Sequence, residues 1–115
     1  MHLQPYYNLL LWVFAAILNA AMDTVTHHYS TSVFKDLDRR FYEPAISWKY
    51  AKNIFGYKFD FWHICKSLMI ISIVIFATSY QSITNNKLLD IFILGAIWNI
   101  IFNLFYNKVF KSRYF

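Results

Sequence analysis

The residues best equipped for chemistry are two pairs of aspartate and histidine that lie far apart in the chain. Asp23 and His27 are four residues apart, and Asp60 and His63 are three residues apart. On helices, each of these spacings places the two side chains on one face. Two such pairs facing each other would offer two imidazoles and two carboxylates, which together suit Zn²⁺, Mn²⁺ or Fe²⁺. The sequence therefore raises the hypothesis of one divalent-metal site with ligands drawn from Asp23, His27, His28, Asp60 and His63.

The same residues also fit a plain hydrogen-bond network at a membrane interface. Asp60 directly precedes an apolar run, so its carboxylate would cap the start of a helix, and His63 would hydrogen-bond that carboxylate. Neither a His-x-x-x-His nor a His-Glu-x-x-His spacing occurs in the sequence. A third interpretation gives these residues a proton-handling or substrate-handling role without a metal. The three interpretations stay open here, and so does the question of whether the chain is an enzyme.

The apolar runs that flank these residues are predicted to be membrane spans. Of the 115 residues, 58% are hydrophobic and only 15% are charged. A soluble domain of this length has too much surface for its volume to bury so much apolar side chain. Apolar runs at about 6–22, 61–80 and 88–106 are each long enough for a membrane-spanning helix. The sequence therefore predicts one all-α membrane domain, residues 1–115, with three transmembrane helices.

The segment between the first two spans, residues 23–60, is predicted to lie along the membrane surface. Aromatic side chains alternate there with lysines, a mixture that places apolar groups against lipid while the ammonium groups extend into the headgroups. Since residues 23–34 contain neither Gly nor Pro, the first helix is also expected to continue beyond the membrane. The basic residues expected to contact lipid headgroups are Arg39, Arg40, Lys49, Lys52 and Lys58.

Basic residues are distributed very unevenly between the two sides of the membrane. With three spans, residues 23–60, the start of the second span with Lys66, and the C-terminal tail share one side, which carries ten of the eleven Lys and Arg residues; Lys87 alone lies on the other side. Because basic residues stay cytoplasmic, the sequence predicts an inner-membrane protein with its N-terminus outside and its C-terminus in the cytoplasm. The same topology brings both Asp/His pairs to one depth at the cytoplasmic interface.

A stripe of asparagines follows the third span. Asn99, Asn103 and Asn107 repeat every four residues and share one helix face. An amide in hydrocarbon is unfavourable without a partner, so we expect this face to look inward at Asn19 or at another subunit. The alternative is a polar path for a small solute. Asp90 lies near the predicted start of this span, where water reaches it, and is expected to have no role.

Three short motifs carry a resemblance that covers about a third of the chain. They are Met22-Asp-Thr with His27 and His28 following, Tyr42-Glu-Pro-Ala-Ile-Ser-Trp48-Lys-Tyr50, and Asp60-x-Trp62-His63. With these motifs the chain resembles a group of small, uncharacterised integral membrane proteins of bacteria and their phages. In that group the middle motif reads roughly aromatic-x-Pro-x-x-Ser-Trp, and a Trp-His pair opens the next span. The resemblance implies no known activity.

Three functions are compatible with these patterns. The first is a small inner-membrane protein whose polar Asp/His site acts on a lipid-like substrate at the cytoplasmic interface. The second is a structural or assembly subunit, as a homo-oligomer or in a larger membrane complex, whose asparagine stripe packs against partner helices. The third is a holin-like pore former, because such proteins are also small, three-span and basic at the C-terminus. Membrane lipids are expected partners in every case, whereas nucleic acid is not, because the aromatic residues are committed to the bilayer.

Overall fold

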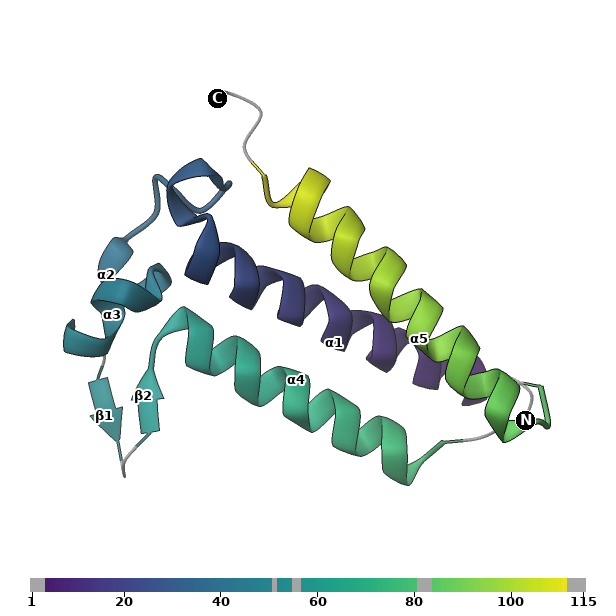
Figure 1. Ribbon diagram of the computed structural model, residues 1–115. Coiled ribbons are helices and arrows are strands. Elements are labelled where there is room, and N and C mark those ends of the chain that lie inside the picture. Colours follow the sequence, from purple (N-terminus) through teal and green to yellow (C-terminus); the bar gives the residue numbers. More distant parts are fainter. Residues whose placement is uncertain (1–3, 51, 55–56, 81–83, 112–115) are drawn as a thin grey trace.

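Three long helices make up most of this multi-pass membrane protein (Figure 1). The computed structural model describes residues 4–50, 52–54, 57–80 and 84–111. Its long helices are α1 (Gln4–His27), α4 (Phe61–Thr78) and α5 (Lys87–Leu104). Each is long and apolar enough to cross a membrane. The predicted all-α architecture with three spans is therefore confirmed.

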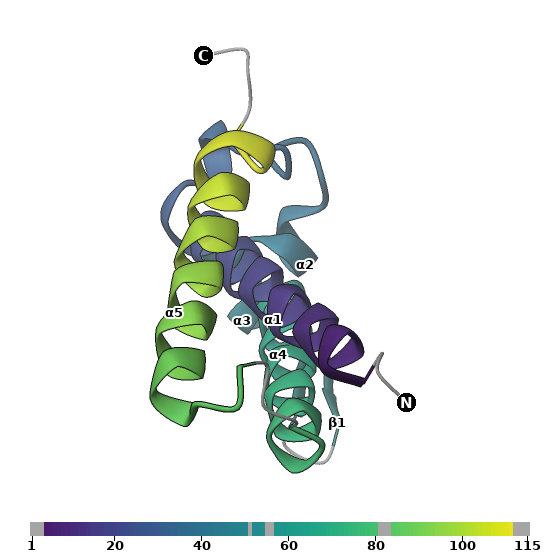
Figure 2. The same cartoon turned by 90° about the vertical axis from the view of Figure 1, so that its right-hand side faces the viewer.

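Helix α1 lies between the other two spans and packs against both of them (Figures 1 and 2). Helices α4 and α5 have hardly any contact with each other in the described part of the chain. Ala15, Ala16 and Ala20 of α1 are completely buried. Because side chains this small let neighbouring helices approach closely, the alanines explain why α1 occupies the central position.

Trp12 of α1 connects all three spans. Its indole N–H donates a hydrogen bond to the Leu94 carbonyl oxygen of α5 at 2.8 Å. Its ring lies 5.0 Å from the ring of Phe76 in α4 and 5.0 Å from the ring of Trp98 in α5. Edge-on and tilted aromatic pairs at this distance are favourable. Trp12 therefore fixes the relative positions of α4 and α5, which scarcely touch each other.

We call the end of the bundle where α4 finishes and α5 begins the turn end. There the Asn8 side chain of α1 donates to the Ser79 carbonyl oxygen. Asp90 is only 1% exposed. Its carboxylate accepts hydrogen bonds from the Thr84 backbone N–H at 3.1 Å, the Thr84 hydroxyl at 2.7 Å, and the Tyr80 hydroxyl. Asp90 is thus a buried acceptor that holds the connection between α4 and α5, and the expectation that it has no role was wrong.

We call the opposite end, where α1 finishes and α4 begins, the loop end. The connection there contains η1 (Tyr29–Thr31), α2 (Arg39–Tyr42) and α3 (Pro44–Tyr50), followed by the short strands β1 (Lys52–Ile54) and β2 (Tyr57–Phe59). The two strands pair antiparallel, with Lys52 opposite Phe59 and Ile54 opposite Tyr57. This small hairpin was not predicted. The placement of the connection along the membrane surface stays a prediction.

Helix α1 ends at His27 and does not continue toward residue 34 as expected. His28 has φ −136° and ψ 33°, outside the helical region. The Ser32 hydroxyl donates to the Tyr29 carbonyl oxygen at 2.7 Å and accepts from the Phe34 N–H at 3.1 Å. Such local bonds between side chain and backbone compete with helical hydrogen bonding. The serines and threonines therefore turn the chain here.

A small apolar core lies between α1 and α4 at the loop end. Its buried members are Leu18, Ala21, Met22 and Cys65. Partly buried apolar side chains from the connection and the end of α5 pack around them, namely Phe34, Phe61, Trp62, Met69 and Phe110. A five-residue π-helix, η2 (Phe105–Val109), extends α5 and brings Phe110 to this core. This core lies on the side of α1 that faces α4.

Candidate functional site

Asp60 is the centre of a hydrogen-bond network at the start of α4. Its carboxylate caps the helix, because Oδ1 accepts the His63 backbone N–H at 2.8 Å. The same oxygen lies 2.6 Å from Nδ1 of the His63 ring. The other oxygen, Oδ2, accepts the Ser47 hydroxyl of α3 at 2.7 Å. The interpretation of Asp60 as a helix cap that also binds His63 is confirmed, and both carboxylate oxygens are in use.

The surroundings of Asp60 stabilise its charged form. Burial by itself raises the pKa of a carboxyl group. The hydrogen bonds from Ser47 and from the backbone and ring of His63 oppose that effect and hold the pKa of Asp60 below its ordinary value of 3.8. With the carboxylate ionised, Nδ1 of His63 is the protonated ring nitrogen. Its Nε2 is left for another partner, and the His63 side chain is 37% exposed.

The β-hairpin also contacts this network, through Tyr57. Tyr57 of β2 donates its phenolic proton to the His63 carbonyl oxygen at 2.8 Å, and its oxygen lies 2.7 Å from Oγ of Ser67. Sequence reasoning missed Ser47, Tyr57 and Ser67 as parts of the site. Ser47 lies in the aromatic-x-Pro-x-x-Ser-Trp motif, which was the one available signal. Nothing in the spacing of Tyr57 and Ser67 indicated their contact.

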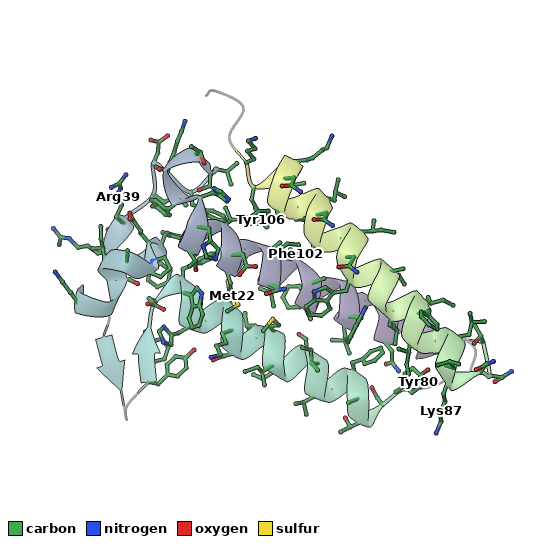
Figure 3. The ribbon with its side chains drawn as sticks, in the orientation of Figure 1. Met22, Arg39, Tyr80, Lys87, Phe102 and Tyr106 are labelled. Carbon is green, nitrogen blue, oxygen red and sulfur yellow. The ribbon has the colours of Figure 1, made fainter. Side chains whose placement is uncertain are left out.

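Asp23 and His28 belong to a different polar cluster, on the side of α1 that faces α5. The His28 ring packs edge-on against the Tyr106 ring, with centroids 5.3 Å apart. Asp23 is close enough to Tyr106 to interact with it electrostatically. In Figure 3, Tyr106 lies between α1 and the end of α5, whereas Met22 lies between α1 and α4. The two sides of α1 therefore carry separate groups.

The structure thus divides the five residues of the predicted metal site among three places. Asp60 and His63 form one pair, Asp23 and His28 adjoin Tyr106, and His27 is exposed at the last residue of α1. Among the residues that the structure describes, no group of three or more His, Cys, Asp or Glu side chains is placed to hold a metal ion. The two Asp/His pairs do not meet, and metal binding stays a prediction.

The asparagine stripe lies on the outer surface of α5. Asn99, Asn103 and Asn107 are all exposed, and none has a hydrogen-bond partner within the described part of the chain. Gly95, one turn earlier on the same line, is exposed as well, and a Cβ built there meets nothing within 4 Å. The amides make no hydrogen bond to Asn19. Packing of this face against another subunit stays a prediction.

The basic residues expected at lipid headgroups are only partly described. Arg39 lies at the outer edge of the connection (Figure 3), 3.6 Å from Glu43 and with its guanidinium 5.6 Å from the centre of the Tyr29 ring. Arg40 and Lys49 are exposed. The side chains of Lys52 and Lys58 lie outside the part of the chain whose side chains are described. Contact with lipid stays a prediction for all five residues.

A comparison with models of known protein families found no match, and neither did comparisons with curated proteins and with solved structures. The resemblance to the small bacterial and phage membrane proteins stays a prediction. The roles of the residues described above therefore rest on their contacts, burial and charge.

Proposed function

We propose that this protein is a self-associating subunit of a membrane assembly, in which α5 of one copy packs against α5 of another. One observation carries the proposal: Gly95, Asn99 and Asn103 form an exposed line on a membrane span, and the fold itself does not use them. Only 6% of the most apolar stretch of this span is buried, compared with 44% of the corresponding stretch of α1. Helix α5 therefore has a large surface available to another helix.

The exposed line is costly unless another helix covers it. A polar group without a partner in hydrocarbon costs several kcal/mol, roughly 2–7 kcal/mol depending on the reference. Glycine within a helix costs about 1 kcal/mol relative to alanine, and no close neighbour in this chain requires a glycine at position 95. A helix packed on this line would approach closely at Gly95 and hydrogen-bond with Asn99 and Asn103.

A second copy of the same chain is the partner that fits this line best. An amide side chain has both donors and acceptors, so an asparagine is complementary to another asparagine. Copies inserted in the same orientation have parallel α5 helices, which places each asparagine at the same depth as its counterpart. A spacing of four residues favours a right-handed crossing of the kind seen for small-residue interfaces, which is about −40°.

We further infer that the assembly lies in the inner membrane with the loop end facing the cytoplasm. Ten of the eleven Lys and Arg residues belong to that end or to the adjoining tail. Basic residues near span ends are retained on the cytoplasmic side. The C-terminus is then cytoplasmic, and the stripe runs across the membrane toward the cytoplasmic interface.

The experiment that tests self-association measures donor–acceptor energy transfer between labelled copies in lipid vesicles at several protein-to-lipid ratios. We expect Asn99→Leu and Asn103→Leu each to weaken association about three- to tenfold, because an interhelical hydrogen bond is worth about 0.6–1.5 kcal/mol. Gly95→Leu should weaken association by preventing close approach, whereas Asn103→Gln keeps the amide and should retain most of it.

Ile100→Leu is the matched control, since Ile100 is 65% exposed on α5 but lies off the line. Association that is unchanged in the Gly95 and Asn103 variants, or a wild-type protein that stays monomeric at every ratio, would overturn the proposal. Release of a small dye from the same vesicles by the wild type alone would instead favour the pore-forming function.

A second candidate function is chemistry at His63, and the contact between Asp60 and Nδ1 favours it. A carboxylate on one ring nitrogen fixes the tautomer and leaves Nε2 to take a proton from a lipid-like substrate or to bind a metal. Asp60 would then orient His63 and would not itself be a ligand. Elemental analysis of the purified wild type and of His63→Ala tests the metal: about one equivalent lost in the variant supports it, and no metal after growth with added Zn²⁺, Mn²⁺ and Fe²⁺ excludes it.

A further inference from the structure

A pocket of about 350 Å³ lies at the loop end, between the end of α1, η1 and η2. Ligand sites of drug-sized molecules begin at about this volume, near 300 Å³. All of its lining residues are polar, and no carboxylate is among them: Thr24, His28, Thr31, Ser32, Tyr106, Asn107 and Lys111.

The hydrogen-bond donors in the pocket come from a subset of these residues. Three hydroxyl groups already give their protons to backbone carbonyl oxygens: Thr24 to Ala20 at 2.7 Å, Ser32 to Tyr29 at 2.7 Å, and Thr31 to His28 at 3.3 Å. The other four side chains are an imidazole, a phenol, an amide and an ammonium group, each of which can donate, and the Lys111 side chain already takes part in another interaction of the chain. They converge on one space from two segments, His28 from the turn directly after α1 and Tyr106, Asn107 and Lys111 from η2 and the residues after it.

The backbone around the pocket holds these donors in place. The Val33 N–H donates to the Phe110 carbonyl oxygen at 2.7 Å, and Ser32 and Lys111 form a bridge between the two segments. Tyr106 is stacked on Phe102 with ring centroids 5.2 Å apart (Figure 3). The last turn of the chain before Lys111 is a π-helix, a form that is rare and frequent at functional sites. The pocket is therefore an organised feature of the fold.

The depth of the pocket indicates where its ligand comes from. It lies where the apolar spans Asn8–His27 and Lys87–Val109 both end. Two spans that end together place this pocket at the boundary between hydrocarbon and water, the depth of phospholipid headgroups. A phosphodiester at that depth is an anion that only accepts hydrogen bonds, which matches a lining rich in donors and free of carboxylates.

We propose that this pocket binds the phosphate group of an anionic phospholipid headgroup. The proposal does not depend on self-association through α5. Asn107 belongs to both features, so the variants that test the pocket leave Asn107 unchanged. The two proposals can therefore fail separately.

Asp23 provides a test of the sign of the ligand's charge. It does not line the pocket, but it interacts electrostatically with Tyr106, which does. Asp23→Asn removes a negative charge beside the pocket and should strengthen the binding of an anion. If the pocket instead held a cation or an amine, the same substitution would weaken binding.

The experiment titrates three soluble probes into the protein in a non-ionic detergent and measures their dissociation constants by calorimetry. The probes are short-chain phosphatidylglycerol, short-chain phosphatidylcholine and inorganic phosphate. We expect phosphatidylglycerol to bind most tightly, and about tenfold more weakly to His28→Ala and to Lys111→Gln, as the loss of a hydrogen bond to a charged group implies. Tyr106→Phe removes one donor but keeps both ring contacts, so it tests the pocket with little risk to the fold.

Two matched controls lie at the same end of the molecule but outside the pocket. His27→Ala removes the neighbouring histidine, and Lys66→Gln removes an exposed lysine whose ammonium lies 5.1 Å from the centre of the Trp62 ring. Losses in these controls as large as in His28→Ala and Lys111→Gln would overturn the proposal, because they would reveal non-specific attraction. Equal binding of both phospholipids with no effect of the pocket variants would also overturn it. If inorganic phosphate binds as tightly as the phospholipids do, the ligand of the pocket is a soluble phosphate compound and not a lipid headgroup.

Discussion

At the scale of single residues, two aspartates in similar sequence contexts proved to be buried structural acceptors. Asp60 and Asp90 are each 1% exposed, and each sits at or near the start of a membrane span. Both connect a loop to a span through several hydrogen bonds. A buried carboxylate is tolerated only when its oxygens are satisfied in this way. These residues therefore hold the connections at the two ends of the bundle.

The low pKa of Asp60 leads to a prediction about stability and pH. A group whose pKa is lower in the folded state stabilises that state above its unfolded pKa, and this stabilisation is lost as the pH falls through the folded pKa. We expect Asp60→Asn to reduce the free energy of unfolding at pH 7 by about 1–2 kcal/mol, because a charged acceptor is replaced by a neutral one. Below the ordinary Asp value of 3.8, the difference from the wild type should shrink.

Thermal unfolding of the detergent-solubilised protein at pH 7 and at pH 3 measures both effects. Asp36→Asn is the control, because Asp36 is exposed in the same connection. A variant as stable as the wild type at pH 7, or a difference that grows at pH 3, would contradict the assignment of Asp60 as a charged cap.

At the scale of the elements, α1 organises the other two spans. The small alanines of α1 allow close packing, and Trp12 reaches both neighbours. Helices α4 and α5 are otherwise mostly exposed: only 17% and 6% of their most apolar stretches are buried. In lipid such surfaces are covered by acyl chains, so exposure of apolar residues has no cost, whereas exposure of amides does.

We expect Trp12→Leu to loosen the attachment of α5 and to lower the free energy of unfolding by about 2–4 kcal/mol, in the range of large-to-small core substitutions. Trp12→Phe keeps an aromatic ring but loses the bond to Leu94, so its effect should be about 1 kcal/mol. Thermal unfolding in detergent ranks the variants, with Phe14→Leu as control because Phe14 is 43% exposed on α1. Equal losses in Trp12→Phe and Trp12→Leu would assign the whole effect to the hydrogen bond.

At the scale of the whole molecule, the distribution of charge predicts the orientation in the membrane. We expect a cysteine introduced by Lys87→Cys, at the turn end (Figure 3), to react with a membrane-impermeant maleimide in intact cells. A cysteine introduced by Asp36→Cys should react only after lysis. The native Cys65 is 4% exposed and serves as an internal background. The reverse pattern would place the loop end outside.

The number of spans and the helix cap at Asp60 could be predicted from the sequence, because both depend on local properties. Long apolar runs must form helices in a bilayer, whatever they pack against. A carboxylate directly before such a run binds the free N–H groups of the first turn. The bounds of α1 were less predictable, since the end at His27 depends on contacts of Ser32 within the following turn.

The neighbour that each polar face of a helix meets could not be predicted from the sequence, because it depends on how the helices pack. The periodicity of α1 places Asp23 and His27 near one face, but it does not say whether α4 or α5 packs there. In the structure Met22 faces α4 and Asp23 lies toward Tyr106, so the two Asp/His pairs stay apart and a donor-lined pocket forms instead. Likewise, the asparagine spacing showed a common face, and only the packing of α5 on α1 showed that this face points outward. Rotation of a helix about its axis is set by non-local packing, which no local pattern records.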